Sequence, residues 1–206
     1  MHDPYFLAGT AVPDWLNVTD RRVRVRRKHA EPFADDEGPL AAVARGVVRH
    51  HHDDAWFHET AAFHELSLDL TVACRDALPA DEGFRPSFLG HILVEILLDA
   101  ALIAEAPGEL TDYYAVLHQV DPLVVESAVN RMRSPHDGTD KLAPLIAGFR
   151  DLRFLFDYSD DQKLLYRLNQ VMRRVGLPVL PPSFAEILPS SRQLVLARKE
   201  ELLSEG

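Results

Sequence analysis

Residues 40–58 read LAAVARGVVRHHHDDAWFH and combine an apolar helical repeat with a cluster of histidines and aspartates. The first half of this stretch repeats apolar side chains at spacings of three and four residues, at Leu40, Val43 and Val47. Side chains spaced in this way share one face of an α-helix. The pattern predicts a helix that places His50 and Asp54 on one face, together with His58 if the helix is continuous. Alternatively, Asp53 or Asp54 ends one helix and caps the next, which would place His58 differently.

Helical periodicity covers most of the remaining chain. Further helices are predicted over residues 4–18, 58–78, 87–106, 109–120, 122–132, 140–157, 160–175 and 189–204. Only residues 22–26 alternate with period 2, which indicates a short extended segment, and residues 30–39 indicate a polar loop. The predicted fold class is therefore all-α, as a compact bundle of many helices. We predict a single domain over residues 1–206, with the candidate site within about residues 1–120 and a helical half over about 121–206.

Composition limits the class of protein. The chain has 206 residues, and its net charge of -10 argues against general nucleic-acid binding. The single cysteine, Cys74, excludes an intrachain disulfide and suits a reducing cytosol, and its apolar surroundings predict a buried thiol. We expect no secretory signal, because the first residues lack a basic region followed by a long apolar run. Residues 92–106 form the longest apolar stretch, but three acids interrupt it, so we predict a helix buried on most of its surface rather than a membrane span. A soluble, cytoplasmic protein is expected.

The sequence lacks the common catalytic motifs. It contains no phosphate-binding GxGxxG or GxxxxGK[ST] loop, no GxSxG elbow, no CxxC pair and no HExxH. Nucleotide binding through these loops, serine hydrolase chemistry and cysteine-bound structural zinc are therefore not indicated.

Histidines and carboxylates are instead concentrated in a pattern that suggests a metal site. Five of the ten histidines fall within residues 50–64, beside two aspartates. A second set, His91, Glu95 and Asp99, is spaced by four on the most apolar predicted helix, where buried carboxylates need a partner, although this stripe could instead face solvent. Asp14 lies in apolar company as a cap, a turn residue or a ligand. Mixed histidine and carboxylate ligands favour Mn, Fe or Zn, and such a metal suits phosphoester hydrolysis.

A basic run follows the first predicted helix. Residues 19–29 read TDRRVRVRRKH and hold six cationic side chains in an otherwise acidic protein. The run is either a solvated face or a patch that recognises anions, because arginine forks match phosphate and carboxylate. On the second interpretation Arg21, Arg24 and Arg26 are candidates for binding a substrate phosphate.

Three short elements resemble the acyl carrier protein phosphodiesterase family, which is similar to a variant of the HD-type metal-dependent phosphohydrolases. The elements are residues 9–15 (GTAVPDW), residues 46–54 (GVVRHHHDD) and the helix from His91 to Asp99. The family pattern Gly-x-x-x-x-Asp is matched by Gly9 and Asp14. The pattern Gly-Ile-x-x-His-x-x-x-Asp is matched by Gly46, His50 and Asp54. Where the family has Asp-x-x-x-Asp-His, this chain has His91, Glu95 and Ile96.

The resemblance implies an HD-domain-like helical bundle that removes the 4′-phosphopantetheine arm from holo acyl carrier protein, a phosphodiester hydrolysis, with manganese as the metal. The metal ligands would be Asp14, His50, Asp54, His91 and Glu95. Groups that orient these ligands or transfer protons would be His51, His58 and Asp99. The partner would be a phosphate-bearing substrate such as acyl carrier protein. The alternative is a non-catalytic helical interaction protein that keeps the fold but has lost or altered the metal site.

Overall fold

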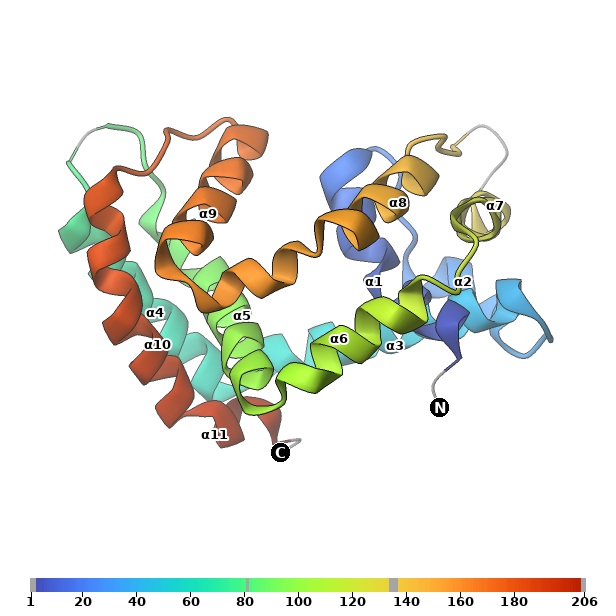
Figure 1. Ribbon diagram of the computed structural model, residues 1–206, viewed down its shortest axis with the longest axis horizontal. Coiled ribbons are helices and arrows are strands. Elements are labelled where there is room, and N and C mark those ends of the chain that lie inside the picture. Colours follow the sequence, from blue (N-terminus) through green and yellow to red (C-terminus); the bar gives the residue numbers. More distant parts are fainter. Residues whose placement is uncertain (1–2, 81, 134–136, 205–206) are drawn as a thin grey trace. The chain divides into compact units, whose positions relative to one another are not determined.

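The computed structural model of the chain describes residues 3–80, 82–133 and 137–204, and these residues contain helices and connecting segments but no strand. The predicted all-α fold class is confirmed (Figure 1). Contacts divide the chain into two compact units. Unit 1 comprises Met1–Ala55 and Thr111–Arg153, and unit 2 comprises Trp56–Leu110 and Phe154–Gly206. The units interleave along the chain, so neither corresponds to the halves expected on either side of residue 120. A single domain stays a prediction.

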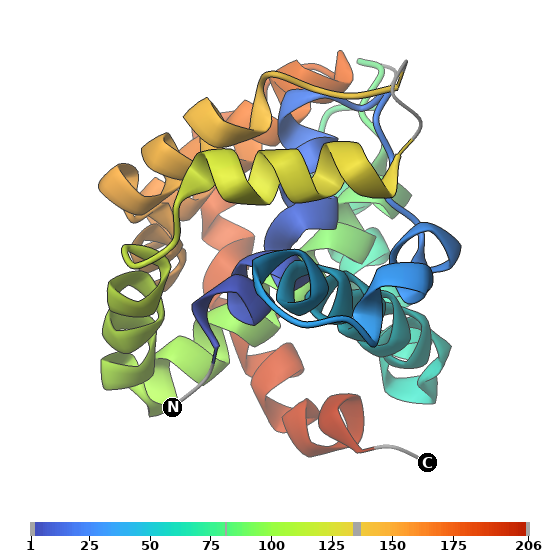
Figure 2. The same ribbon diagram turned by 90° about the vertical axis from the view of Figure 1, so that its right-hand side faces the viewer.

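Unit 1 is built from helices at the start and in the middle of the chain. It holds α1 (Pro4–Thr19), α2 (Arg27–Ala34), most of α3 (Pro39–Glu59), the end of α6 (Pro107–Leu117), α7 (Pro122–Met132) and α8 (Leu142–Leu152). Helix α7 packs beside α8, and both contact α1 (Figures 1 and 2). The ring of Trp15 on α1 meets that of Phe149 on α8 edge-on, with 5.3 Å between centroids. Buried aromatic contact of this kind helps to hold the unit together.

Two glycines let α1 and α3 approach closely. A Cβ atom on Gly46 would lie 2.2 Å from the carbonyl oxygen of Phe6 and 2.7 Å from Cα of Gly9. A Cβ on Gly9 would lie 2.3 Å from the carbonyl oxygen of Val43. Only glycine fits at this crossing, because the opposing atoms belong to the backbone. At this crossing Gly9, five residues before Asp14, lies against Gly46, four residues before His50.

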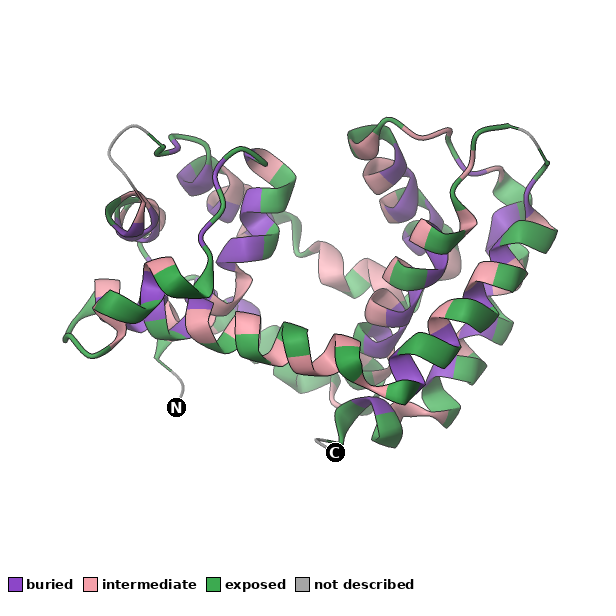
Figure 3. Cartoon of the chain, turned by 180° about the vertical axis from the view of Figure 1, so that it is seen from behind, coloured by how far each residue is buried: buried purple, intermediate pink, exposed green. Residues whose placement is uncertain are grey.

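Unit 2 is built around the pair α4 and α5. It holds the last turn of α3, the start of α6, and α4 (Ala61–Ala77), α5 (Pro86–Glu105), η1 (Phe154–Ser159), α9 (Asp161–Val175), η2 (Pro182–Ile187), α10 (Leu188–Ala197) and α11 (Lys199–Leu203). The η elements are 3-10 helices. Leu70 of α4, Leu93 of α5, Leu168 of α9 and Phe184 of η2 lie in one buried apolar cluster. Buried positions follow one side of these helices (Figure 3).

Helix α5 is long and apolar enough to cross a membrane by length and composition alone. Its fully buried residues, such as Leu89, Leu93 and Leu97, instead pack in the core of unit 2, as a core helix of a soluble protein does. Burial covers one face rather than most of the surface, which corrects the sequence-based expectation. The reason is the polar stripe, because His91 and Asp99 are exposed.

The predicted helices differ from the observed ones in several places. Helix α3 runs without interruption through Asp54, so the alternative of a break at Asp53 or Asp54 is wrong. The start of the expected loop over residues 30–39 belongs to α2. The helix expected over 140–157 divides into α8 and η1, because Arg153 adopts a left-handed backbone conformation with φ of 45° and ends α8.

Candidate metal centre

Three side chains of unit 2 converge where the end of α3 meets α5. His58 comes from the last turn of α3, and His91 and Glu95 lie one turn apart on α5. Nε2 of His58 lies 3.1 Å from Oε1 of Glu95, and Nε2 of His91 lies 3.2 Å from the same oxygen. The three ligand atoms all lie within 4.8 Å of one another. We call these three residues the His58–His91–Glu95 cluster.

A sharp turn at Thr60 positions the first histidine. The Thr60 hydroxyl donates to the carbonyl oxygen of Phe57 over 2.9 Å and accepts from the backbone N–H of Phe63 over 3.2 Å. One side chain thus ends α3 and caps α4, as threonine does at helix N-termini. His58, in the last turn of α3, is thereby held beside Phe63, in the first turn of α4.

Phe63 fixes the orientation of both imidazole rings. The His58 and His91 rings are stacked, with 4.9 Å between centroids and 6° between planes. The Phe63 ring stands nearly perpendicular to each, at 88° to His58 and 87° to His91, with centroid distances of 4.5 and 4.9 Å. Because Phe63 is buried, its edge-on contacts hold the two rings parallel, with both Nε2 atoms toward Glu95.

The second histidine is positioned by close packing of α4 and α5. A Cβ atom on Gly90 would lie 2.5 Å from Oγ1 of Thr71 and 2.6 Å from the carbonyl oxygen of Ser67. Gly90 therefore lets α5 lie against the backbone of α4. Since His91 is the next residue, this contact sets where its imidazole stands relative to Phe63.

The Glu95 carboxylate of the cluster is ionised and accessible to solvent. Partial burial raises the pKa of the Glu95 carboxyl, but hydrogen bonds from His91 and His58 outweigh it, so the pKa lies below its usual value. The side chains of His58, His91 and Glu95 retain 27%, 47% and 42% of their exposure. A cation and water can therefore reach the cluster from solvent. Two imidazoles and one carboxylate form a ligand set used by zinc and by non-haem iron.

The residues predicted for the metal site are distributed over both units. In unit 2 lie His58, His91, Glu95 and Asp99, the last of these exposed on α5. In unit 1 lie Asp14 on α1 and His50, His51 and Asp54 on α3; Asp14 and Asp54 are exposed, and both histidines are half-buried. Across the residues that the structure describes, His58–His91–Glu95 is the only group of three or more metal-binding side chains with ligand atoms this close. The sequence analysis expected His58 to orient the ligands or to transfer protons, whereas its imidazole lies in the cluster as a potential metal ligand. Ligand roles for Asp14, His50 and Asp54 stay predictions.

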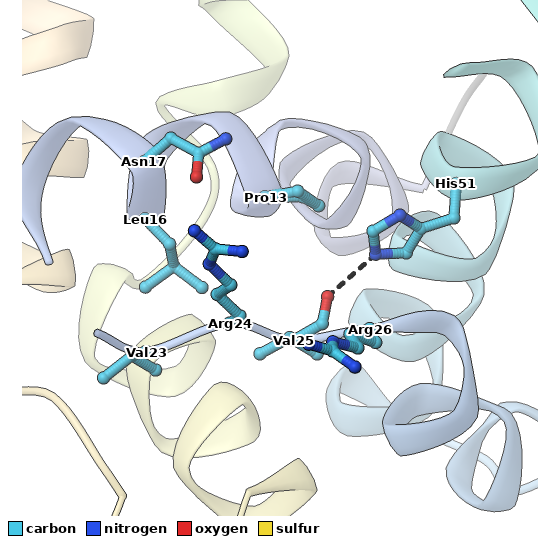
Figure 4. Close-up of a pocket in the computed structure, with 8 residues that line it drawn as sticks. All are labelled: Pro13, Leu16, Asn17, Val23, Arg24, Val25, Arg26 and His51. Atoms are coloured by element: carbon cyan, nitrogen blue, oxygen red, sulfur yellow. Dashed lines mark hydrogen bonds between the residues drawn. The ribbon is translucent and has the colours of Figure 1, made fainter. Parts of the chain in front are cut away.

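Two of the three candidate phosphate-binding arginines lie at one pocket of unit 1. Arg24 and Arg26 line this pocket together with His51 (Figure 4). Nε2 of His51 donates to the carbonyl oxygen of Val25 over 2.8 Å. The residues that line the pocket do not include Arg21, whose Nε donates to the carbonyl oxygen of Asn17 over 3.3 Å.

Sequence reasoning missed the residues that shape the cluster: Thr60, Phe63 and Gly90. Thr60 carried a usable signal, because threonine before the apolar run from Ala61 is a typical N-cap. The other two act through packing between helices, for which the sequence offers no local signal. Comparisons with protein-family models, with curated proteins and with solved structures find no match to this chain.

Proposed function

We propose that the chain is a divalent-metal-dependent phosphohydrolase whose cation is held by His58, His91 and Glu95. The observation that carries the proposal is the convergence of three ligand atoms within 4.8 Å on side chains open to solvent. Three protein ligands leave coordination positions for water and substrate, as in catalytic rather than structural sites. When bound, such a cation activates water and neutralises phosphoryl oxygens.

The surrounding residues support this function in defined ways. Glu95 contributes a negative charge that its two histidine partners keep ionised. Phe63 keeps both imidazoles parallel, which limits the reorganisation needed to bind a cation. Asp99 follows Glu95 by one turn on the exposed side of α5, where we propose that it accepts or donates a proton during hydrolysis.

The substrate class is proposed from the resemblance to acyl carrier protein phosphodiesterases. It is a phosphodiester such as the 4′-phosphopantetheine linkage of an acyl carrier protein, with manganese as the preferred metal and iron or zinc as alternatives. The basic run at residues 21–28 would suit an acidic carrier protein or another phosphate-bearing ligand. Within this proposal the protein acts in the cytoplasm.

Metal titration tests the proposal directly. The full chain, stripped with EDTA, is titrated with Mn²⁺ and with Zn²⁺ by calorimetry, and hydrolysis of bis-(p-nitrophenyl) phosphate is then followed with each metal. We expect about one metal per chain, as in mononuclear sites, and hydrolysis that requires it. The variants His58→Gln and His91→Gln should lose metal binding and activity together. The matched control is His118→Gln, an exposed histidine of unit 1 outside the His58–His91–Glu95 cluster.

Several outcomes separate the possibilities. Failure of the wild-type chain to bind either metal would overturn the proposal, as would equal loss of binding in the His118→Gln control. His50→Ala and Asp54→Ala test the ligands expected from the resemblance. Full metal stoichiometry in His50→Ala would show that His50 is not a ligand, while leaving the cluster of unit 2 as the binding site.

A second candidate is a non-catalytic helical interaction protein. The observation that favours it is that Glu95 Oε1 already accepts hydrogen bonds from Nε2 of both His58 and His91. The cluster then joins the end of α3 to α5 without a cation. This candidate predicts that Mn²⁺ and Zn²⁺ leave the melting temperature unchanged, and that Glu95→Gln destabilises the metal-free chain.

A further inference from the structure

Buried and exposed side chains alternate along the basic run of unit 1. Val23 and Val25 are buried, with 4% and 2% exposure, while Arg22, Arg24 and Arg26 between and beside them are exposed. The predicted alternation is thus confirmed, since neighbouring side chains of an extended segment point to opposite sides. The hydrogen bond from His51 to the Val25 carbonyl ties this segment to α3. Arg24 and Arg26 are therefore exposed on either side of a residue whose carbonyl oxygen is bound to α3.

The arginines of the run differ in their partners. Arg22 pairs with Asp20 over 3.2 Å, and Arg27 pairs with Glu31 over 2.7 Å. Among the residues that the structure describes, no side-chain hydrogen bond or ion pair engages the guanidinium of Arg24 or of Arg26. An arginine without an acidic partner leaves its guanidinium donors available to an oxyanion.

Both unpaired arginines line a pocket of about 330 Å³ in unit 1. This volume is at the small end of the range for ligand pockets. Its apolar walls come from Pro13, Leu16, Val23 and Val25. Its polar lining comes from Arg24, Arg26, Asn17 and His51. In Figure 4 the Arg24 guanidinium extends from the segment toward the helix that carries Asn17.

The donor set defines the ligand chemistry. The bond to a carbonyl oxygen requires a hydrogen on Nε2 of His51, because a carbonyl only accepts. Arg24 and Arg26 are donors only, and the Asn17 amide offers both a donor and an acceptor. Charged donors beside apolar walls fit an anionic head group on an apolar body.

We infer that this pocket binds a small organic oxyanion, with a phosphate or carboxylate head held by Arg24 and Arg26 and an apolar body against the apolar atoms that line the pocket. The site lies entirely within unit 1 and does not depend on a metal at the His58–His91–Glu95 cluster. Its failure and the failure of the proposed hydrolase function are therefore distinguishable.

Calorimetric titration of the EDTA-treated full chain tests the site. The probes are phenyl phosphate, benzoate and inorganic phosphate, in a buffer of low ionic strength. We expect phenyl phosphate to bind about tenfold more tightly than inorganic phosphate, because its ring leaves water for the apolar walls. Tighter binding of benzoate than of phenyl phosphate would support the site with carboxylate as the head group.

Variants decide whether the two arginines form the site. The double variant R24Q/R26Q should bind phenyl phosphate at least about tenfold more weakly, since each charge-assisted hydrogen bond is lost. Arg27→Gln is the control for each single variant, R24Q and R26Q, because it removes one charge from the same run at a residue paired with Glu31. It should bind within about twofold of the wild type, as expected for a screened surface charge.

Two results would overturn the inference. One is the absence of binding of all three probes to the wild-type chain. The other is an equal loss in Arg27→Gln and in the single variants R24Q and R26Q, which would show general attraction to a basic surface. The melting temperature of R24Q/R26Q should stay close to that of the wild type, because neither guanidinium has an ion-pair partner among the described residues to lose.

Discussion

Replacing Gly46 by alanine should destabilise the protein through the crossing of α1 and α3. The added Cβ would stand 2.2 Å from the Phe6 carbonyl oxygen and 2.7 Å from Cα of Gly9. Non-bonded carbon atoms rest about 3.5–4.0 Å apart. Because the opposing atoms are backbone, no side-chain rotation relieves the clash. The two helices must therefore move apart by roughly 1 Å or more.

The size of the effect follows from two opposing contributions. Overpacking of a buried contact costs about 1–3 kcal/mol and sometimes more. Alanine recovers about 1 kcal/mol relative to glycine within a helix, because it restricts the unfolded backbone. The distances at Gly46 place its clash at the upper end, so we expect the free energy of unfolding to fall by about 2 kcal/mol.

Urea unfolding followed by circular dichroism measures this change. The matched control is Gly148→Ala on α8, where an added Cβ meets no atom within 4 Å. That variant should gain about 0.5–1 kcal/mol from helix propensity alone. If Gly46→Ala proved as stable as the wild type while Gly148→Ala behaved as expected, α1 and α3 would not approach closely at Gly46, and the described packing of unit 1 would be wrong.

Two further predictions concern buried ionisable groups. Burial raises the pKa of the Cys74 thiol to about 12, so the native chain should resist a thiol reagent that reacts once urea unfolds it; rapid native-state labelling would contradict this. The hydrogen bond from Arg22 lowers the pKa of the Asp20 carboxyl despite its burial. This bond therefore stabilises the fold above the unfolded pKa of about 4, and the contribution disappears as pH falls through the lower folded value. Urea unfolding of the wild type and of Asp20→Asn gives the difference between their free energies of unfolding at each pH. This difference should become smaller between neutral and acidic pH, and a difference that stays constant would refute the prediction.

Helices with a strong apolar repeat could be predicted from the sequence, whereas weakly patterned ones could not. The helix expected over residues 122–132 is observed with the same bounds as α7. Helix α2 was missed because only Ala30 is buried in it and Pro32 lies inside it. The apolar repeat of residues 140–157 continues past Arg153, whose left-handed backbone ends α8, so periodicity alone indicated a single helix.

The candidate site could be predicted only within single helices. A spacing of four placed His91 and Glu95 on one face of α5, and the structure brings their side chains together. The contact between His58 and Glu95 joins residues far apart in the chain. It depends on the turn at Thr60 and on the approach of α4 to α5 at Gly90, and neither produces a periodic pattern. The number of charges in the basic run likewise could not distinguish Arg27, which pairs with Glu31, from Arg24 and Arg26, which have no ion-pair partner among the described residues.

The histidine-rich stretch has a different meaning once α3 is known to be continuous. His51 donates to the Val25 carbonyl in unit 1, and His58 stacks on His91 in unit 2. One helix thus contributes a histidine to each of the two proposed sites, so the clustering of histidines along the sequence does not require a single metal centre. Variants separate the two contributions. His91→Gln should abolish metal binding and leave phenyl phosphate binding intact. R24Q/R26Q should weaken phenyl phosphate binding and leave metal binding intact.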